Sequence, residues 1–330
     1  MHTGNSQCWK TFGVYLVVFV LGIVSFAALQ KLWNAAHACV PEFDLLSPAK
    51  TCASTEAALS EWDYEPLRQE LIKRIAHYTA TGGTVPHIAL YFRDLKHSAR
   101  LSIRENEIFE PASLIKLPIM MTILHEADRH PELLDESIPY EKEDSYRFIT
   151  GPLDNTLKLH SSYTVRELLQ KMIRYSDNSS TTLLQNKINE LGLLENSNTF
   201  SDLGTMQLVL SGQLDNTRLI SLVNIFVALY NANYLSQNYS QFALQLLVQT
   251  NFDRGIVAGV PKNIRVAHKY GLRVGSTPAE NELHDCGIVY HPSSPYILCI
   301  LTAGADLQTA SSAIQDISGI VYDNIDRLKQ

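Results

Sequence analysis

The sequence predicts an α+β fold, and three observations lead to that class. Two candidate strands lie near the start of the folded part, three more lie near its end, and the middle has the pattern of helices. The candidate strands are short apolar runs bounded by turn residues, whereas the middle repeats apolar residues at helical spacing. We therefore expect one antiparallel five-stranded sheet built from both ends of the chain and flanked by helices, beside an all-helical lobe.

Composition limits what the chain can do. Its 330 residues are 45% hydrophobic and 18% charged, which is typical of a globular protein with a sizeable core. The net charge of -7 leaves no basic surface for phosphates, so we expect no nucleic-acid partner. There is no Cys-x-x-Cys or His-Glu-x-x-His pattern and the 11 histidines are scattered, so we expect neither a metal nor a cofactor.

An uncharged apolar run, residues 11–29, lies between Lys10 and Lys31. It is long enough to span a bilayer, so we predict an uncleaved transmembrane signal anchor. Residues 36–38 (Ala-His-Ala) resemble a cleavage site, which keeps a cleaved signal peptide open, and a buried globular helix is a third alternative. The predicted organisation is a cytoplasmic tail and membrane anchor at 1–31, a stalk or linker at 32–65 and a folded domain at 66–330.

Four of the five cysteines fall into two pairs with different expectations, and the fifth, Cys8, would be cytoplasmic. Cys39 and Cys52 lie just beyond the membrane segment, where they could form a disulfide in an oxidising compartment or remain free thiols. Cys286 and Cys299 flank a predicted hairpin whose turn we place at residues 293–294. Counting outward from that turn puts the two cysteines out of register, so we expect them to be unpaired.

The folded part begins with a helix over residues 66–80. A proline suits its first position, apolar residues mark one face, and the glycines at 82–83 end it. Residues 87–94 are predicted to form a strand and residues 101–107 its hairpin partner. A helix over 112–124 follows.

The middle of the chain is read from caps and periodicity. Residues 131–162 are polar and rich in turn residues, which indicates a solvated loop. Thr164 and Glu167 form a capping-box pattern, which predicts a helix that ends before residues 176–178 and a second helix after them. Residues 191–218 are predicted to be loop. The remaining predicted elements are helices over 220–230, 240–248 and 311–328 and strands over 264–274, 287–290 and 296–301.

The stretch around Ser113 carries the first chemical signal. Ser113 and Lys116 are three residues apart and share one face of the predicted helix. A lysine in apolar surroundings can lose its proton and accept that of a serine, which makes Ser113 a candidate nucleophile. The same spacing at Ser47 and Lys50 encloses Pro48 and is typical of a surface loop. Taken alone, the Ser113 motif is also compatible with a helix N-terminus and a solvated lysine.

Two further motifs follow along the chain. Residues 176–178 (Ser-Asp-Asn) lie between two predicted helices, and residues 269–271 (Lys-Tyr-Gly) lie on a predicted strand. Residues 236–238 (Ser-Gln-Asn) also fit the Ser-x-Asn spacing, so no motif is specific alone. The structural alternative is that the serine and asparagine cap a helix and the lysine pairs with an exposed carboxylate. The order and contexts of the three motifs together favour a shared site.

With these motifs the chain resembles the penicillin-recognising serine acyl hydrolases and, within them, the class A beta-lactamase family, whose motifs are Ser-x-x-Lys, Ser-Asp-Asn and Lys-Thr-Gly. The similar stretches are residues 109–116 (Phe-Glu-Pro-Ala-Ser-Leu-Ile-Lys), 175–178 (Tyr-Ser-Asp-Asn) and 266–269 (Val-Ala-His-Lys). The resemblance covers roughly residues 66–328 and implies a beta-lactamase/DD-peptidase-like fold.

The resemblance also implies catalytic roles. Ser113 would attack a carbonyl carbon while Lys116 takes its proton, directly or through water, and Ser176 would pass a proton to the leaving nitrogen. In the family, a loop with Glu-x-x-Leu-Asn supplies the glutamate that activates the deacylating water. Residues 196–216 contain no glutamate, and their nearest fragment offers only Asp215. An acyl-enzyme would therefore form and clear slowly.

Substrate binding is implied for the other motif residues. Asn178 would hydrogen-bond a substrate amide, and the Lys269 ammonium would favour an anionic substrate. The backbone N–H of Leu272, after Gly271, would join that of the nucleophile in an oxyanion hole. Tyr270 stands where the family usually has a threonine that contacts the substrate carboxylate, and that contact is lost if the ring faces the other side of the sheet.

These inferences predict a membrane-anchored serine hydrolase of the class A beta-lactamase type, acting through an ester on Ser113. Its small-molecule partner would be a beta-lactam or a cell-wall peptide, which places the domain outside the cytoplasmic membrane, in the periplasm or at the cell surface. The alternatives are a D-alanyl-D-alanine carboxypeptidase or transpeptidase with slow deacylation, and a non-catalytic sensor of cell-wall fragments or beta-lactams. We expect a monomer that meets the membrane through residues 11–29.

Overall fold

The computed structural model describes residues 43–47, 64–97, 99–104, 106–142, 157–193, 199–205 and 216–327. All of them belong to the compact unit formed by residues 43–330. The predicted membrane segment, residues 11–29, and Cys39 and Cys52 lie outside the described residues. Within the described ranges, no helix is both long and apolar enough to cross a bilayer.

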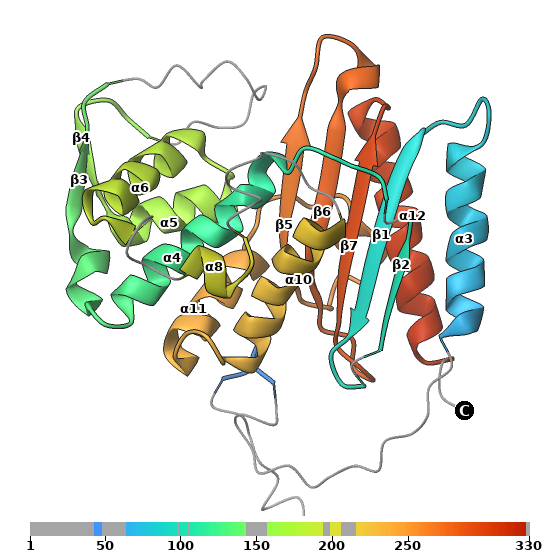
Figure 1. Cartoon of the computed structure of the whole chain (residues 1–330), viewed down its shortest axis with the longest axis horizontal. Helices are drawn as coiled ribbons and strands as arrows, with labels where there is room; N and C mark the ends of the chain where they lie inside the picture. Colours follow the sequence, from blue (N-terminus) through green and yellow to red (C-terminus); the bar gives the residue numbers. More distant parts are fainter. Residues whose placement is uncertain are drawn as a thin grey trace, which may run out of the picture. The chain divides into compact units, whose positions relative to one another are not determined.

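The two ends of the chain share one antiparallel sheet, as the sequence predicts (Figure 1). Its strands lie in the order β2-β1-β7-β6-β5, so the sheet pairs β1 from the start of the domain with β7 from its end. This order makes β5, which carries the Lys-Tyr-Gly motif, an edge strand. The strands are β1 (His87–Asp94), β2 (Arg100–Ile103), β5 (Val266–Arg273), β6 (Glu282–Val289) and β7 (Tyr296–Ala303).

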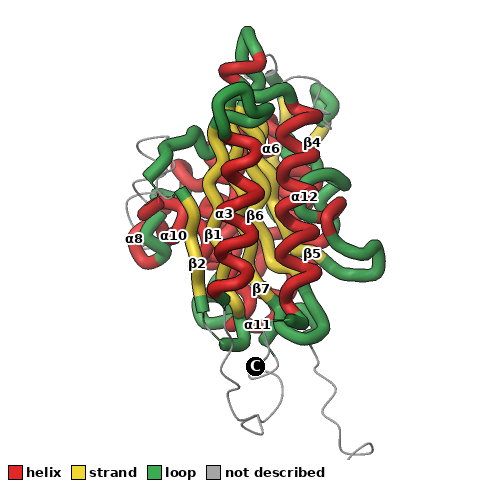
Figure 2. Tube along the Cα trace, turned by 90° about the vertical axis from the view of Figure 1, so that its right-hand side faces the viewer, coloured by secondary structure: helices red, strands yellow, loops and turns green. Residues whose placement is uncertain are grey.

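Both faces of the sheet are covered, which explains why its strands are nearly continuous apolar runs. Helices α3 (Glu65–Thr79) and α12 (Leu307–Ile325) cover one face and lie side by side in Figure 2. Ile88, Leu90 and Phe92 of β1 pack on that side. Ala89 and Tyr91 alternate with them and pack against the helical lobe on the other face.

The helical lobe lies between β2 and β5 in the sequence. Thr164 caps α5 as predicted, because its hydroxyl accepts the N–H of Glu167 at 3.2 Å and the Glu167 carboxylate accepts the N–H of Thr164 at 2.8 Å. The lobe contains η1 (Ala112–Ile115), α4 (Lys116–Ala127), α5 (Val165–Arg174), α6 (Asn178–Glu190), α8 (Thr199–Asp202), α10 (Asn216–Asn231) and α11 (Gln237–Val248).

The prediction of a loop over residues 131–162 is wrong in part. The structure forms η2 (Pro131–Asp135) there, followed by β3 (Ser137–Tyr140), which pairs antiparallel with β4 (Ser161–Thr164). Four-residue strands contain too few alternations for periodicity to reveal them, and their polar residues resemble those of a loop.

Residues 43–47, within the predicted linker, pack into the domain. Leu45 and Leu46 are only 2% and 4% exposed. The Asp44 carboxylate accepts hydrogen bonds from Gln241 Nε2 at 2.7 Å and from Arg265, and Gln241 Oε1 accepts the N–H of Leu45 at 3.2 Å. This short segment therefore ties the start of the compact unit to the helical lobe and to the beginning of β5.

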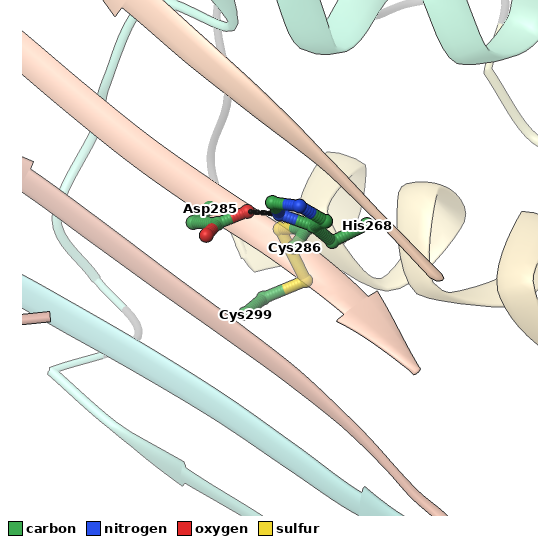
Figure 3. The surroundings of a disulfide bond; sticks show 4 residues. All are labelled: His268, Asp285, Cys286 and Cys299. Atoms are coloured by element: carbon green, nitrogen blue, oxygen red, sulfur yellow. Dashed lines mark hydrogen bonds and ion pairs between the residues drawn. A yellow bond between two sulfur atoms is a disulfide. The ribbon is translucent and has the colours of Figure 1, made fainter. Parts of the chain in front are cut away.

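The expectation that Cys286 and Cys299 are unpaired is wrong, because the structure joins them in a disulfide (Figure 3). The two residues are direct partners across β6 and β7, with Cα atoms 4.0 Å apart. Val289 pairs with Tyr296, so the turn is centred one residue earlier than predicted. Moving the centre of a hairpin by one residue changes every cross-strand partner by two, and this small error separated the cysteines.

Candidate active site

Ser113 and Lys116 lie at the start of one helical stretch, as their spacing predicts. Ser113 is in the 3-10 turn η1, and Lys116 is the first residue of α4. Ala112, just before the serine, has a φ of 46°, a left-handed value that costs a non-glycine residue about 1–3 kcal/mol and clusters at functional sites. Ser113 is 8% exposed and Lys116 2%, so the two side chains meet almost out of contact with bulk water.

The Lys116 amine is surrounded by oxygen atoms. Its Nζ lies 3.0 Å from Ser113 Oγ, 3.0 Å from Ser176 Oγ, 2.8 Å from Asn178 Oδ1 and 2.5 Å from the Ser176 carbonyl oxygen. The amide and carbonyl oxygens only accept, so they take N–H groups from the lysine. A neutral amine has two N–H groups and one lone pair, and the lone pair is then left for a hydroxyl proton. The geometry suits a neutral Lys116 that accepts the proton of Ser113.

The environment favours that neutral form. Burial lowers the pKa of Lys116 to about 7, and the carboxylate of Asp177 only partly opposes this. Asp177 is itself buried and caps α6, with its Oδ1 accepting the N–H of Ser180 at 2.6 Å. A lysine with a pKa near 7 is about half neutral at neutral pH, so it can act as a general base. The sequence named Asp177 within its motif but did not reveal this charge beside the lysine.

Ser176 connects Lys116 to the third motif. Lys269 Nζ lies 2.9 Å from Ser176 Oγ, so one hydroxyl contacts both amines. Lys269 is fully buried, and burial together with the nearby Lys116 charge places its pKa well below the ordinary value, with Asp285 opposing. The tertiary structure thus brings together the serine and lysine residues that the sequence predicted, and it lets the Ser176 hydroxyl pass a proton between two amines.

A buried carboxylate that the sequence analysis missed lies behind this site. Asp285 is the cross-strand partner of Tyr270, and its Oδ1 is 2.8 Å from His268 Nδ1 (Figure 3). Its Oδ2 accepts the N–H of Ile256 at 3.0 Å. No sequence motif marks this residue, because only the register of β5 and β6 places it beside the lysine strand.

Tyr270 is part of the packing around Lys269. Its side chain is 2% exposed, its ring stacks on Phe252 with centroids 4.4 Å apart, and the ring centroid is 4.0 Å from Lys269 Nζ. Leu272 packs with the core on the α12 side of the sheet. The ring of Tyr270 is therefore enclosed by protein atoms, while the substrate-binding roles of residues 270–272 stay predictions.

Gly271 lets β5 approach the segment that carries Ser113. A Cβ at this position would lie 2.9 Å from the Pro111 carbonyl oxygen and 3.3 Å from Leu114 Cγ. We predict that Gly271→Ala lowers the rate at which Ser113 is acylated at least about tenfold, because the strand and the serine turn must separate. Intact-mass kinetics measure that rate. Gly319→Ala on α12, where the added Cβ meets only an ordinary contact at 3.4 Å, is the control, and equal rates for the two variants would contradict the prediction.

The loop in which the family carries its deacylating glutamate falls largely outside the described residues. Of residues 196–216, only 199–205 and 216 are described, and Asp215 is not among them.

The described ranges also contain no group of three or more His, Cys, Asp or Glu side chains arranged to hold a metal ion. The groups that the structure places in contact with Lys116 Nζ are hydroxyl, amide and carbonyl oxygens.

Comparison with known proteins identifies relatives of this fold. The model of the beta-lactamase enzyme family matches residues 67–325, whereas no curated protein matches the chain. A beta-lactamase from Chitinophaga pinensis superposes with a TM-score of 0.63 and 18% identity, over 78% of this chain and 98% of that one. A class A beta-lactamase from Mycobacterium abscessus gives 0.62 and 21%, over 79% and 99%. PBP-A gives 0.59 and 22%, over 82% and 100%.

Proposed function

The chain belongs to the beta-lactamase enzyme family, and from this premise we propose that it is a serine hydrolase that opens amide or lactam bonds through an acyl-enzyme on Ser113. The observation that carries the proposal is the contact between Ser113 Oγ and the buried Lys116 amine at 3.0 Å. A serine needs an adjacent base to become a nucleophile, and a lysine whose pKa is about 7 is such a base.

The bond changes follow from this geometry. Ser113 Oγ forms a bond to the carbonyl carbon as its proton moves to Lys116 Nζ. The C–N bond then breaks, and the Ser176 hydroxyl, in contact with both amines, delivers a proton to the leaving nitrogen. The backbone N–H groups of Ser113 and Leu272 would stabilise the oxyanion. Water finally hydrolyses the ester and regenerates the serine.

Two activities are compatible with this chemistry. Beta-lactam hydrolysis is the leading proposal. A D-alanyl-D-alanine carboxypeptidase or transpeptidase is the second, because residues 196–216 contain no glutamate to speed deacylation. One solved structural relative, a mutant of PBP-A, is described as an acyl-enzyme complex with penicillin G.

We place the domain outside the cytoplasmic membrane, anchored by residues 11–29 and monomeric. The apolar run supports the anchor. The disulfide between Cys286 and Cys299 supports an oxidising compartment, since disulfides are rare in the cytosol. Fractionation of cells that produce the full chain tests the anchor and the location. The protein should pellet with membranes and be digested by protease added outside the membrane. Recovery in the cytosolic fraction would overturn this placement.

Intact-mass measurement of the full chain mixed with a penicillin tests the activity. An acyl adduct on Ser113 that persists supports the peptidase, and rapid hydrolysis of the penicillin without a lasting adduct supports the beta-lactamase. Ser113→Ala should abolish the adduct, whereas Ser47→Ala, in the second Ser-x-x-Lys sequence, should leave it unchanged. Penicillin binding that survives in Ser113→Ala, with no adduct in the natural protein, would favour the non-catalytic sensor.

A further inference from the structure

The backbone of Glu110, three residues before the nucleophile, is held at both of its polar groups by β6. His284 Nε2 lies 2.8 Å from the Glu110 carbonyl oxygen, and Glu282 Oε2 accepts the N–H of Glu110 at 2.9 Å. The two side chains also meet each other, with 3.1 Å between His284 Nε2 and Glu282 Oε2. One imidazole and one carboxylate therefore hold the two peptide groups that flank the Cα of Glu110.

The contacts define the protonation of the ring. A carbonyl oxygen and a carboxylate only accept hydrogen bonds, so Nε2 must carry the hydrogen that both of them share. His284 is fully buried, and its Nδ1 has no hydrogen-bond partner among the described residues. The hydrogen of this shared contact therefore belongs to the ring nitrogen Nε2.

The ring also fits between three elements. His284 is the cross-strand partner of Gly271 on β5, and a Cβ on that glycine would lie 3.4 Å from His284 Cδ2. On its other side the ring meets Phe109 edge-on, with centroids 5.5 Å apart and planes at 82°. The imidazole therefore packs against the motif glycine and against the segment that leads to the nucleophile.

The residues that follow Glu110 explain why its hydrogen bonds to His284 and Glu282 matter. After Glu110 come Pro111 and then Ala112, whose left-handed φ of 46° turns the chain so that Ser113 meets Lys116. A strained residue keeps its conformation only when its surroundings hold it. The hydrogen bonds to the peptide groups of Glu110 lie immediately before this turn.

We propose that His284 is a positioning residue for acylation: its Nε2–H, together with the Glu282 carboxylate, holds the Glu110 peptide so that the turn at Ala112 presents Ser113 to Lys116. This role rests on the proposed function of Ser113 as the nucleophile. His284 contacts neither reacting group. It acts through the backbone that carries the serine.

The test compares His284→Leu with His284→Gln in the full chain. The glutamine Nε2 can replace the imidazole Nε2–H, whereas leucine removes it. We expect His284→Leu to lower the maximal acylation rate by about 10- to 100-fold at an unchanged half-saturating penicillin concentration, and His284→Gln to recover to within about threefold of the natural protein. Labelling by a fluorophosphonate, which needs the serine but not lactam recognition, should follow the same order.

Two controls keep the result interpretable. His291 is also buried, at 3% exposure, just beyond the opposite end of β6, so His291→Leu should reduce stability without changing the maximal acylation rate. In the natural protein, the nitrogen chemical shifts of labelled His284 should show hydrogen on Nε2. Equal rates in His284→Leu and the natural protein, a glutamine variant no faster than leucine, or an Nε2 without hydrogen would each overturn the role. A natural protein that reacts with neither reagent would instead overturn the proposed function, and this role with it.

Discussion

Replacing Lys116 with arginine is expected to lower the acylation rate by about 100- to 10,000-fold, the range associated with loss of a general base. Arginine keeps the positive charge but does not release its proton in proteins. The four oxygen atoms around Lys116 Nζ would still be close to a cation, while the lone pair that receives the Ser113 proton in the proposed mechanism would be absent.

The same base predicts how acylation depends on pH. Burial lowers the pKa of Lys116 to about 7, and only the neutral amine accepts a proton. The neutral fraction rises with pH, so the rate should rise about tenfold per unit below pH 7 and level off above it. At pH 5 we expect a rate about a hundredfold below the plateau. Single-turnover acylation measured from pH 5 to 9 gives this profile.

Lys187 provides the matched control for Lys116. It is also a largely buried lysine of the helical lobe, at 8% exposure, but it lies 2.7 Å from Glu136 and 3.0 Å from Glu190. Burial lowers its pKa, yet the hydrogen bonds to these two carboxylates outweigh burial and raise it overall. Lys187→Arg should therefore acylate like the natural protein. Rapid acylation of Lys116→Arg, or a rate that does not change between pH 5 and 8, would remove Lys116 as the base.

Loss of the Cys286–Cys299 disulfide is expected to lower the free energy of unfolding by about 3 kcal/mol, because the bond closes a loop of about 14 residues in the unfolded chain. Cys286→Ala combined with Cys299→Ala removes it. Both cysteines are fully buried on the helical-lobe side of the sheet, and Cys286 is the cross-strand partner of Lys269. Part of the loss will come from the two small cavities that alanine leaves.

Reduction separates the disulfide from these cavities. Denaturant unfolding of the natural protein should shift to lower denaturant when a reductant is present, whereas the double alanine variant should unfold at the same midpoint with and without it. Two free thiols titrated at positions 286 and 299 in the unreduced protein would show that the bond does not contribute to stability. The same conclusion would follow if the unfolding midpoint of the natural protein did not change with the reductant.

Local patterns in the sequence were sufficient for much of this fold. The capping box at Thr164 and Glu167, the strand over residues 87–94 and the helix after Pro111 each depend on interactions within a few residues, and all were predicted. The short strands β3 and β4 were not predicted, since their pairing joins residues 137–140 to 161–164 and leaves little local pattern.

For the candidate site, the amino-acid sequence was enough to name Ser113, Lys116, Ser176 and Lys269, because a three-residue helical spacing and three motifs in a set order are local or linear features. Only the tertiary structure could show that the Ser176 hydroxyl contacts both Lys116 and Lys269, and that burial lowers the pKa of both amines. It alone also decided the cysteine pairing and the contact of His284 with Glu110. These depend on strand register, in which a one-residue change in a turn moves every partner, and no local interaction encodes that register.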